Sequence, residues 1–523
     1  MLKTKIQEYI PEGANIQIHD TVALFEVSAS EIEKVAGDLH HDMNLTLKLI
    51  TATDEREGHG CFKIWYVFGV PGENIFIVPF IQLQGTTEFP SLSPTIHAAL
   101  NYERKIQTFF GLTPTPNHDS RPILLHENWP ADVFPLKKDF EYQSRPKTAK
   151  GTYHFQKVGG EGIYEIPVGP IHAGIIEPGH FRFSVAGEQI VLLEARLGFT
   201  HKGSEKLFEI LSLGDKVKLS EKISGDSSFS HSLAFCQAVE KLSDTKVPVR
   251  ARYLRVVYAE LERLANHFGD IGAIMTDTGF NFGGAQGSRL REIVMQMNES
   301  ITGNRFLRGV NGIGGVIKDI DDGERNTVAL KLEDISKDFS EVIAVADNST
   351  SLLNRLKGTG VLSAAIAEDR GVVGVAGKAV GRASDARVDY PYAAYDELSI
   401  GAVPTERGGD VFARFRVRIK EVYASIKIIQ DALRELPAGD INIPSRSVVC
   451  KKNALSISVV EGWRGEIVYF VATDANGNIS RVAPRDPSFV NWAALGDAGF
   501  DNVVPDFPLI NKSFNLSYSG NDL

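Results

Sequence analysis

The sequence predicts an α+β protein, in which a small N-terminal α+β domain precedes a large, mainly α-helical bundle domain with small β elements. Short runs of alternating apolar and polar residues near the N-terminus predict strands. Three long apolar seams with helical spacing follow, and alternating runs return after residue 450. We expect domains at residues 1–140 and 162–523, joined by a linker at residues 141–161.

The N-terminal domain is predicted to combine strands with two helices. Strands are expected at residues 14–27, 44–52 and 61–70, where alternation coincides with residues that favour β structure. One helix is expected from Ser30, as its N-cap, to Asp42, and a second at residues 94–110, closed by Gly111. Residues 141–161 are polar and rich in Lys, Gly and Gln, which indicates the linker.

The large domain is predicted to contain a helical bundle. Apolar residues recur every three or four positions at 248–268, 332–356 and 412–436, with Gly358 and Pro437 ending the last two runs. Helices with one apolar face bury it against each other, so these stripes indicate packing and not a cofactor site. Strands are expected at residues 454–460 and 466–472.

Composition excludes several classes of protein. The net charge of −10 and the absence of a long basic run argue against nucleic acid as a partner. No stretch reaches the roughly 20 apolar residues of a membrane span, and residues 1–8 lead into no signal-peptide run, so we expect a cytoplasmic location. Cys61, Cys236 and Cys450 lack CxxC spacing, which indicates buried thiols instead of a metal or iron–sulfur site.

Motifs along nearly the whole chain resemble one family. Those of the N-terminal part resemble the small subunit of respiratory complex I: residues 102–104 (YER), 109–112 (FFGL), 122–125 (PILL), Trp129 and 135–140 (PLKKDF). Those of the larger part resemble the large subunit of membrane-bound, energy-converting NiFe hydrogenases of the formate hydrogenlyase type, and the homologous quinone-site subunit of complex I: residues 169–183, 198–203, 248–251, 464–466 and 505–509. Fusion of the two parts is also the arrangement of formate hydrogenlyase.

The metal loops of that family are present without their thiolates. In the hydrogenases, a CxxC loop followed by histidine and a DPCxxC loop bind nickel and iron. The resemblance places Ser224, Ser227, Ser488 and Asn491 at the four cysteine positions, where they would line the cavity. Hydroxyl and amide oxygens are hard, weak donors that do not replace soft thiolates. We therefore expect no metal and no cofactor bound by this chain.

The resemblance also suggests an acid–base group around the same loops. Glu177 aligns with a proton-relay glutamate, and His180, His231 and Asp486 are its candidate catalytic partners. Other cavity candidates are His172, His201, Lys378 (where the hydrogenases carry arginine) and Asp385. The alternative is that these groups satisfy one another's hydrogen bonds. His267, on a helix face with Glu260 and Arg263, is interpreted as structural, and the family's quinone-binding tyrosine position is Gly225.

The resemblance implies a cytoplasmic-side subunit of a membrane-anchored, complex I-like oxidoreductase. Its implied partners are a small iron–sulfur subunit, which holds the nearest cluster, and antiporter-like membrane subunits. The chain would then shape a cavity at the end of the electron path, where a quinone or another small acceptor binds. One alternative is a non-catalytic scaffold that couples assembly or conformational change to ion movement. A second, an active hydrogenase, conflicts with the ligand changes.

Overall fold

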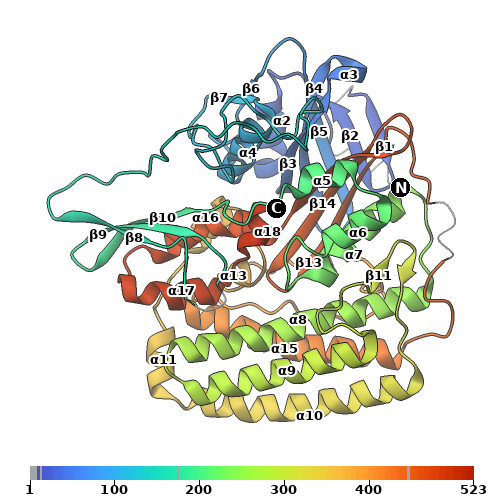
Figure 1. Ribbon diagram of the computed structural model, residues 1–523. Helices are drawn as coiled ribbons and strands as arrows, with labels where there is room; N and C mark the ends of the chain where they lie inside the picture. The colour runs from blue at the N-terminus through green and yellow to red at the C-terminus, as the bar shows by residue number, and fades with distance from the viewer. Residues whose placement is uncertain (1–8, 12–13, 174–175, 444–447) are drawn as a thin grey trace.

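The computed structural model describes residues 9–11, 14–173, 176–443 and 448–523. The expectation that residues 1–8 lead into no signal peptide therefore concerns residues outside the described ranges. Mixed helices and sheets confirm the α+β class. An N-terminal sheet, a central sheet and a layer of long helices follow one another from top to bottom in Figure 1. The β8–β10 sheet extends to one side, at the left of that view.

The N-terminal sheet has the strand order β1-β2-β5-β4-β3, with β2 and β5 parallel and the other pairs antiparallel. Its strands are β1 (Ile16–His19), β2 (Val22–Glu26), β3 (Thr46–Glu55), β4 (Cys61–Val70) and β5 (Ile75–Leu83). The predicted strand at 14–27 is in fact the hairpin β1–β2, because Asp20 turns the chain with a positive φ of 53°. The strand β5 was not predicted.

Helices and short strands accompany this sheet. They are α2 (Ile32–Gly37), the π-turn η1 (Asp38–Asp42), α3 (Arg56–His59), η2 (His97–Ala99), α4 (Leu100–Phe110), β6 (Glu88–Pro90) and β7 (Thr113–Thr115). The N-cap of α2 is Glu31 and not Ser30, and α4 begins at Leu100 and not at residue 94. Gly111 closes α4 in the left-handed conformation, as predicted. Residues 116–162, all described, form no helix or strand.

The long helices pack as an antiparallel layer, with α8 between α9 and α15 and with α10 against both α9 and α15 (Figure 1). They are α8 (Val249–Asp277), α9 (Asn281–Thr302), α10 (Asp322–Asp347), α11 (Thr350–Leu356) and α15 (Val411–Arg434). The single helix expected at 332–356 is two helices, because the Ser349 side chain accepts a hydrogen bond from Leu352 N and caps α11. The helix α9 was missed because glycines occupy its first turns.

A three-stranded antiparallel sheet, β13 (Leu455–Gly462), β14 (Gly465–Thr473) and β15 (Ile479–Arg485), lies between the N-terminal sheet and the helices (Figure 1). Leu455, Ile457 and Phe470 from this sheet belong to the same apolar core as the N-terminal strands. The other face packs against α7 (Ser228–Leu242), which is almost entirely buried. The core of the N-terminal part therefore continues into the large domain.

Shorter elements complete the fold around this centre. They are β8 (Ile163–Val168), β9 (His180–Ala186), β10 (Gln189–Arg196), α5 (Ser204–Ile210), α6 (Leu213–Ser220), β11 (Asn311–Gly312), β12 (Gly315–Val316), α12 (Ala364–Asp369), α13 (Gly374–Lys378), α14 (Ala386–Asp389), α16 (Pro487–Gly499), η3 (Val504–Asp506), α17 (Phe507–Phe514) and α18 (Tyr518–Asp522). Of the helices within the described ranges, none combines the length and apolar character of a membrane span.

Candidate functional site

The structure brings the two altered metal loops together. One loop, residues 221–227, leads into α7, and the other lies at the start of α16, where Asp486 is the N-cap and accepts a hydrogen bond from Ser488 N. His231 Nε2 is 3.0 Å from Asp486 Oδ2, and its Nδ1 is 3.1 Å from the Tyr469 hydroxyl. Burial alone would raise the pKa of Asp486, but the hydrogen bond and charge of His231 lower it below its ordinary value.

The side chain of Ser517 lies between these loops. Its Oγ is 2.9 Å from the hydroxyl of Ser224, and its backbone N donates to the hydroxyl of Ser488 at 2.9 Å. The same Ser517 Oγ accepts a hydrogen bond from Gly520 N. Ser224 and Ser488 have no exposed surface, and Ser227 is only 2% exposed. The hydroxyl groups at two former ligand positions are therefore held by a third serine instead of facing open space.

An ion pair also holds the first loop. Arg464, in the turn between β13 and β14, donates to both carboxylate oxygens of Asp226 at 2.6 Å, and its guanidinium stacks on the Trp463 ring. Burial opposes ionisation of Asp226, but the charge of Arg464 lowers the pKa of that carboxyl below its usual value. Such a two-pronged pair, with a buried guanidinium on an aromatic ring and a carboxylate that is 34% exposed, holds the loop in one geometry.

The C-terminal residues 516–523 pack directly against the predicted acid–base residues. Glu177 accepts a hydrogen bond from Ser519 N at 3.0 Å, and His201 Nδ1 is 2.7 Å from the Asp522 carbonyl oxygen. Burial lowers the pKa of His201. At Gly520, an added Cβ would lie 2.6 Å from Asp486 Cγ, so only glycine permits this approach. In these contacts Glu177 and His201 bond the backbone of the C-terminal residues and not each other.

Other predicted site residues lie elsewhere. Asn491 holds the backbone of Val373 through both its amide oxygen and its amide nitrogen. Lys378 and Asp385 pair with each other at 2.6 Å in a separate buried cluster, and within the described chain no hydrogen bond joins either one to His231 or Asp486. That they line the same cavity stays a prediction, because no described contact tests it.

His172 and His180 also lie apart from the two loops. They belong to the β8–β10 region, where each bonds a backbone carbonyl, those of Gly179 and Gly169 respectively. Burial lowers the pKa of His180. Their ring nitrogens are used to shape the connection between β8 and β9, and among the described residues neither ring is hydrogen-bonded to His231.

The donor set does not fit a nickel–iron centre. The four positions offer oxygen and amide groups that already have protein partners or are buried at the start of helices. Nickel and iron of this kind need soft thiolates. Within the described ranges, no group of three or more His, Cys, Asp or Glu side chains is arranged to hold a metal ion. Cys61, Cys236 and Cys450 are free and buried.

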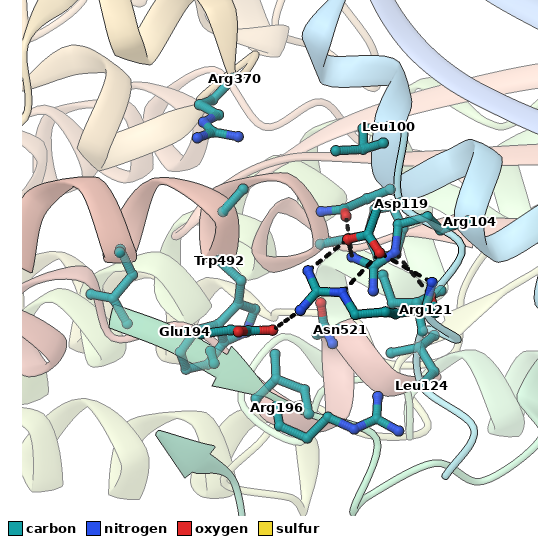
Figure 2. Close-up of a pocket in the computed structure, with 18 of the residues that line it drawn as sticks. Leu100, Arg104, Asp119, Arg121, Leu124, Glu194, Arg196, Arg370, Trp492 and Asn521 are labelled. Atoms are coloured by element: carbon teal, nitrogen blue, oxygen red, sulfur yellow. Dashed lines mark hydrogen bonds and ion pairs between the residues drawn. The ribbon is translucent and has the colours of Figure 1, made fainter. Parts of the chain in front are cut away.

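A large cavity, of about 610 Å³, lies beside these loops, and none of the four former ligand positions lines it. It is bounded by α4, β10 and α16, and Figure 2 shows Arg104 and Arg121 pointing toward Asp119, with Glu194 on the other side of Arg121. Arg121 donates to Asp119 at 2.7 Å and to Glu194. Trp492 of α16 and Asn521 of the C-terminal residues 516–523 form part of its wall.

Sequence reasoning missed several residues of the site. Ser517, Asp226, Tyr469 and Glu262 were not singled out, and Arg464 was noted only as part of a motif. Glu262 accepts hydrogen bonds from the backbone N of Phe229 and Ser230 and so positions the start of α7. Ser517 carries no sequence signal, because its role depends on contacts across 293 positions.

Comparisons with known proteins agree with this architecture. Residues 25–146 match the family of the 30 kDa subunit of respiratory-chain NADH dehydrogenase, and residues 277–458 match that of its 49 kDa subunit. The chain is 32% identical to formate hydrogenlyase subunit 5 of Escherichia coli, covering 95% of this chain and 88% of the relative. It is 34% identical to hydrogenase-4 component G of the same organism, covering 95% and 87% respectively.

A relative from the NADH-quinone oxidoreductases is more distant. This protein of Bacteroides fragilis is 29% identical over 419 residues, which cover 77% of this chain and 79% of the relative. The long matches to the two hydrogenase components, over almost the full length of this chain, show the family. The chain therefore belongs to the oxidoreductase family that includes the hydrogenase components of formate hydrogenlyase and hydrogenase-4 and the 30 kDa and 49 kDa subunits of respiratory-chain NADH dehydrogenase.

Proposed function

We propose that this chain is a coupling or scaffold subunit of a membrane-anchored, complex I-like oxidoreductase complex, and that it holds no NiFe centre. It lies on the cytoplasmic side and reaches the membrane through its partners. Those partners are a small iron–sulfur subunit and antiporter-like membrane subunits. Family membership supports the complex, and the site geometry supports the non-catalytic role.

The position of Ser517 carries this proposal. In a chain that bound a metal or a small acceptor between the loops, the space between residues 224 and 488 would be open to that ligand. Here the hydroxyl groups of Ser224 and Ser488 both contact Ser517, and Arg464 holds Asp226 of the first loop. Polar groups that already have partners at the centre favour a structural centre over a reactive one.

Metal analysis of the purified complex tests the first half of the proposal. The complex is isolated through an affinity tag on this chain, and nickel and iron are measured by elemental analysis. We expect iron from the partner subunit and less than about a tenth of an equivalent of nickel, because no soft ligand pair is present. Nickel near one equivalent per chain, together with hydrogen evolution, would overturn it.

The role of Glu177 tests the second half. Changing Glu177→Gln keeps the acceptor for Ser519 N but removes titration. A scaffold role predicts that electron transfer through the complex changes by less than about twofold. A proton-relay role predicts a loss of about 10²-fold or more with intact assembly, the usual effect of removing a general acid–base group. The second outcome would show that Glu177 takes part in catalysis and would contradict the scaffold role.

The cavity of about 610 Å³ favours a second candidate function, the binding of a quinone or another small acceptor beside α16. Its wall combines aromatic side chains, Phe489, Trp492 and Tyr153, with arginine donors such as Arg104 and Arg370. Its volume lies within the usual range of small-molecule sites, and its lining combines apolar side chains with many polar and charged ones. In this case the acceptor would bind next to the former metal position and not within it.

A substitution that fills the cavity separates the two candidates. Ala493 lines the cavity, and Ala493→Trp would occupy part of its volume. The matched control is Ala344→Trp, at an exposed position of α10. If the acceptor binds in this cavity, quinone reduction by the complex falls at least about tenfold in the first variant and is unchanged in the control. Equal rates in both variants would exclude the cavity as the acceptor site.

A further inference from the structure

Seven charged side chains meet where α8, α15 and the segment with α13 and α14 approach the hairpin β13–β14. They are the cations Arg263, Lys378 and Arg387 and the carboxylates Glu260, Asp385, Glu421 and Glu461. Each side chain is at most 2% exposed, and ion pairs within 4 Å connect all seven. We call this set the buried ionic cluster.

The buried ionic cluster has one carboxylate more than it has cations. Within the described chain, no other Lys or Arg forms an ion pair with any of the four carboxylates. His267 lies beside Arg263 and Glu421, but burial, reinforced by the charge of Arg263, lowers its pKa well below its usual value, so it stays neutral. Asp389, whose carboxylate accepts from Asp385 N, adds further negative charge nearby. An unbalanced buried charge is costly, and protonation removes it.

The hydrogen bonds single out Glu461 as the uncompensated carboxylate. Glu421 accepts from Lys378, Arg263 and Arg387. Asp385 and Glu260 also each accept from at least one of these cations. Glu461, by contrast, accepts only from Ala386 N on Oε2, and Oε1 finds no donor among the described residues, since Lys378 Nζ is 3.6 Å away.

The electrostatic surroundings of Glu461 also favour its protonated form. Burial is the main cause that raises the pKa of Glu461 to about 7, and the negative charge of Asp385 raises it further, while Lys378 and Arg263 oppose the shift. Glu421 and Asp385 show the reverse balance, because their contacts with the three cations outweigh burial and lower the pKa of each.

We propose that the buried ionic cluster is a proton-binding site, in which Glu461 carries one proton at neutral pH and releases it when the charge around the hairpin changes. Solvent comes close to this residue, because the Glu461 backbone N donates to the Tyr392 hydroxyl at 3.0 Å and Tyr392 lines a second cavity of about 280 Å³. On the other side, Arg263 donates to the Gly462 carbonyl, two residues before Arg464.

The hairpin β13–β14 thus connects the proton site to the altered metal loop. Residues 461–462 contact the buried ionic cluster, and Arg464 of the same turn holds Asp226. Gain or loss of the Glu461 proton would change the net charge next to this turn. This inference goes beyond the scaffold role, and it holds whether or not the complex reduces an acceptor.

Infrared spectroscopy of the purified complex tests the site, with Glu466 as the matched control. Glu466 is directly opposite Glu461 in the β13–β14 pairing and is also buried, but it is neutralised by Lys48 and Arg485. In the wild-type complex we expect the carbonyl stretch of a protonated carboxyl group at pH 6, lost with a midpoint near pH 7. Glu461→Gln should remove the Glu461 part of this band and leave the part from Glu262, whose pKa burial also raises to about 7, whereas Glu466→Gln should leave the band unchanged.

Thermal unfolding at pH 8 provides a second readout. Gln resembles a protonated glutamate, so Glu461→Gln should keep or raise the unfolding temperature. Glu466→Gln leaves two buried cations without their carboxylate partner and should lower the unfolding temperature. A wild-type complex without a titrating carboxyl band would overturn the proposal. So would a band of undiminished intensity in Glu461→Gln, or an equal loss of thermal stability in both variants.

Discussion

At the scale of single residues, Ser517 determines what the altered metal loops have become. Its hydroxyl and backbone N contact Ser224, Ser488 and Gly520 in a region without solvent. Changing Ser517→Ala leaves the buried Ser224 hydroxyl and Gly520 N without this partner. We expect a loss of about 1–3 kcal/mol in the free energy of unfolding, measured by denaturant titration.

The control for this prediction is Ser340→Ala. Ser340 is exposed on α10, and its hydroxyl bonds the Lys337 carbonyl one turn earlier. A surface change of this kind should stay within about 0.5 kcal/mol of the wild type. Similar values for the two variants would show that Ser517 does not hold the loops together.

Glu262 is predicted to make stability depend on pH. Burial raises the pKa of this carboxyl from 4.5 to about 7, against the hydrogen bonds that it accepts from Ser230 and Phe229. Between these two pH values the folded chain binds more protons at Glu262 than the unfolded chain, so stability falls as pH rises and is then constant above about pH 7. This shift in the pKa of Glu262 corresponds to roughly 3 kcal/mol in the free energy of unfolding.

Glu262→Gln should remove this contribution to the pH dependence. The free energy of unfolding is compared at pH 5 and pH 8 in the wild type and the variant, and we expect a smaller difference in the variant. The amide weakens the bonds to the start of α7, so both values can fall. An unchanged difference between the two pH values would assign the titration to another group.

At the scale of elements, the contact between α8 and α9 depends on glycine. A Cβ on Gly287 would lie 2.6 Å from the Cα of Gly272, and neither backbone can move without separating the helices. Gly287→Ala should therefore destabilise the chain by about 1–3 kcal/mol in chemical unfolding. Gly214→Ala in α6, where no atom lies within 4 Å, should be neutral or stabilising by up to about 1 kcal/mol.

At the scale of the whole molecule, we propose residues 171–173 and 176–179, between β8 and β9, as the contact for the iron–sulfur subunit of the proposed complex. Ile171 is 87% exposed and Ile176 is 41% exposed, and a partner that covered these two side chains would remove their apolar surface from water. Changing both residues to Asp should lower the iron that co-purifies with the tagged chain at least about tenfold. Leu330→Asp, on the exposed face of α10, should leave it unchanged.

Periodicity in the sequence was sufficient to predict the fold class, because helices and strands depend on residues that are neighbours along the chain. The strands at 61–70 and 465–473 and the long helices α8 and α15 follow directly from alternation and from three- and four-residue spacing. Elements without such a pattern were missed, as with the glycine-rich start of α9. Ser349 interrupted an apolar seam, and only the structure shows that it caps a new helix.

The resemblance to the hydrogenases identifies four ligand positions in the sequence, and residue chemistry shows that they lack thiolates, because donor softness belongs to the side chain and not to the fold. Only the tertiary structure decided what fills their place. Ser517 meets Ser224 across 293 positions, His231 meets Asp486 across 255, and Lys378 lies away from both in the buried ionic cluster. Such contacts depend on how the layers pack, and burial then decides which carboxyl group keeps its proton.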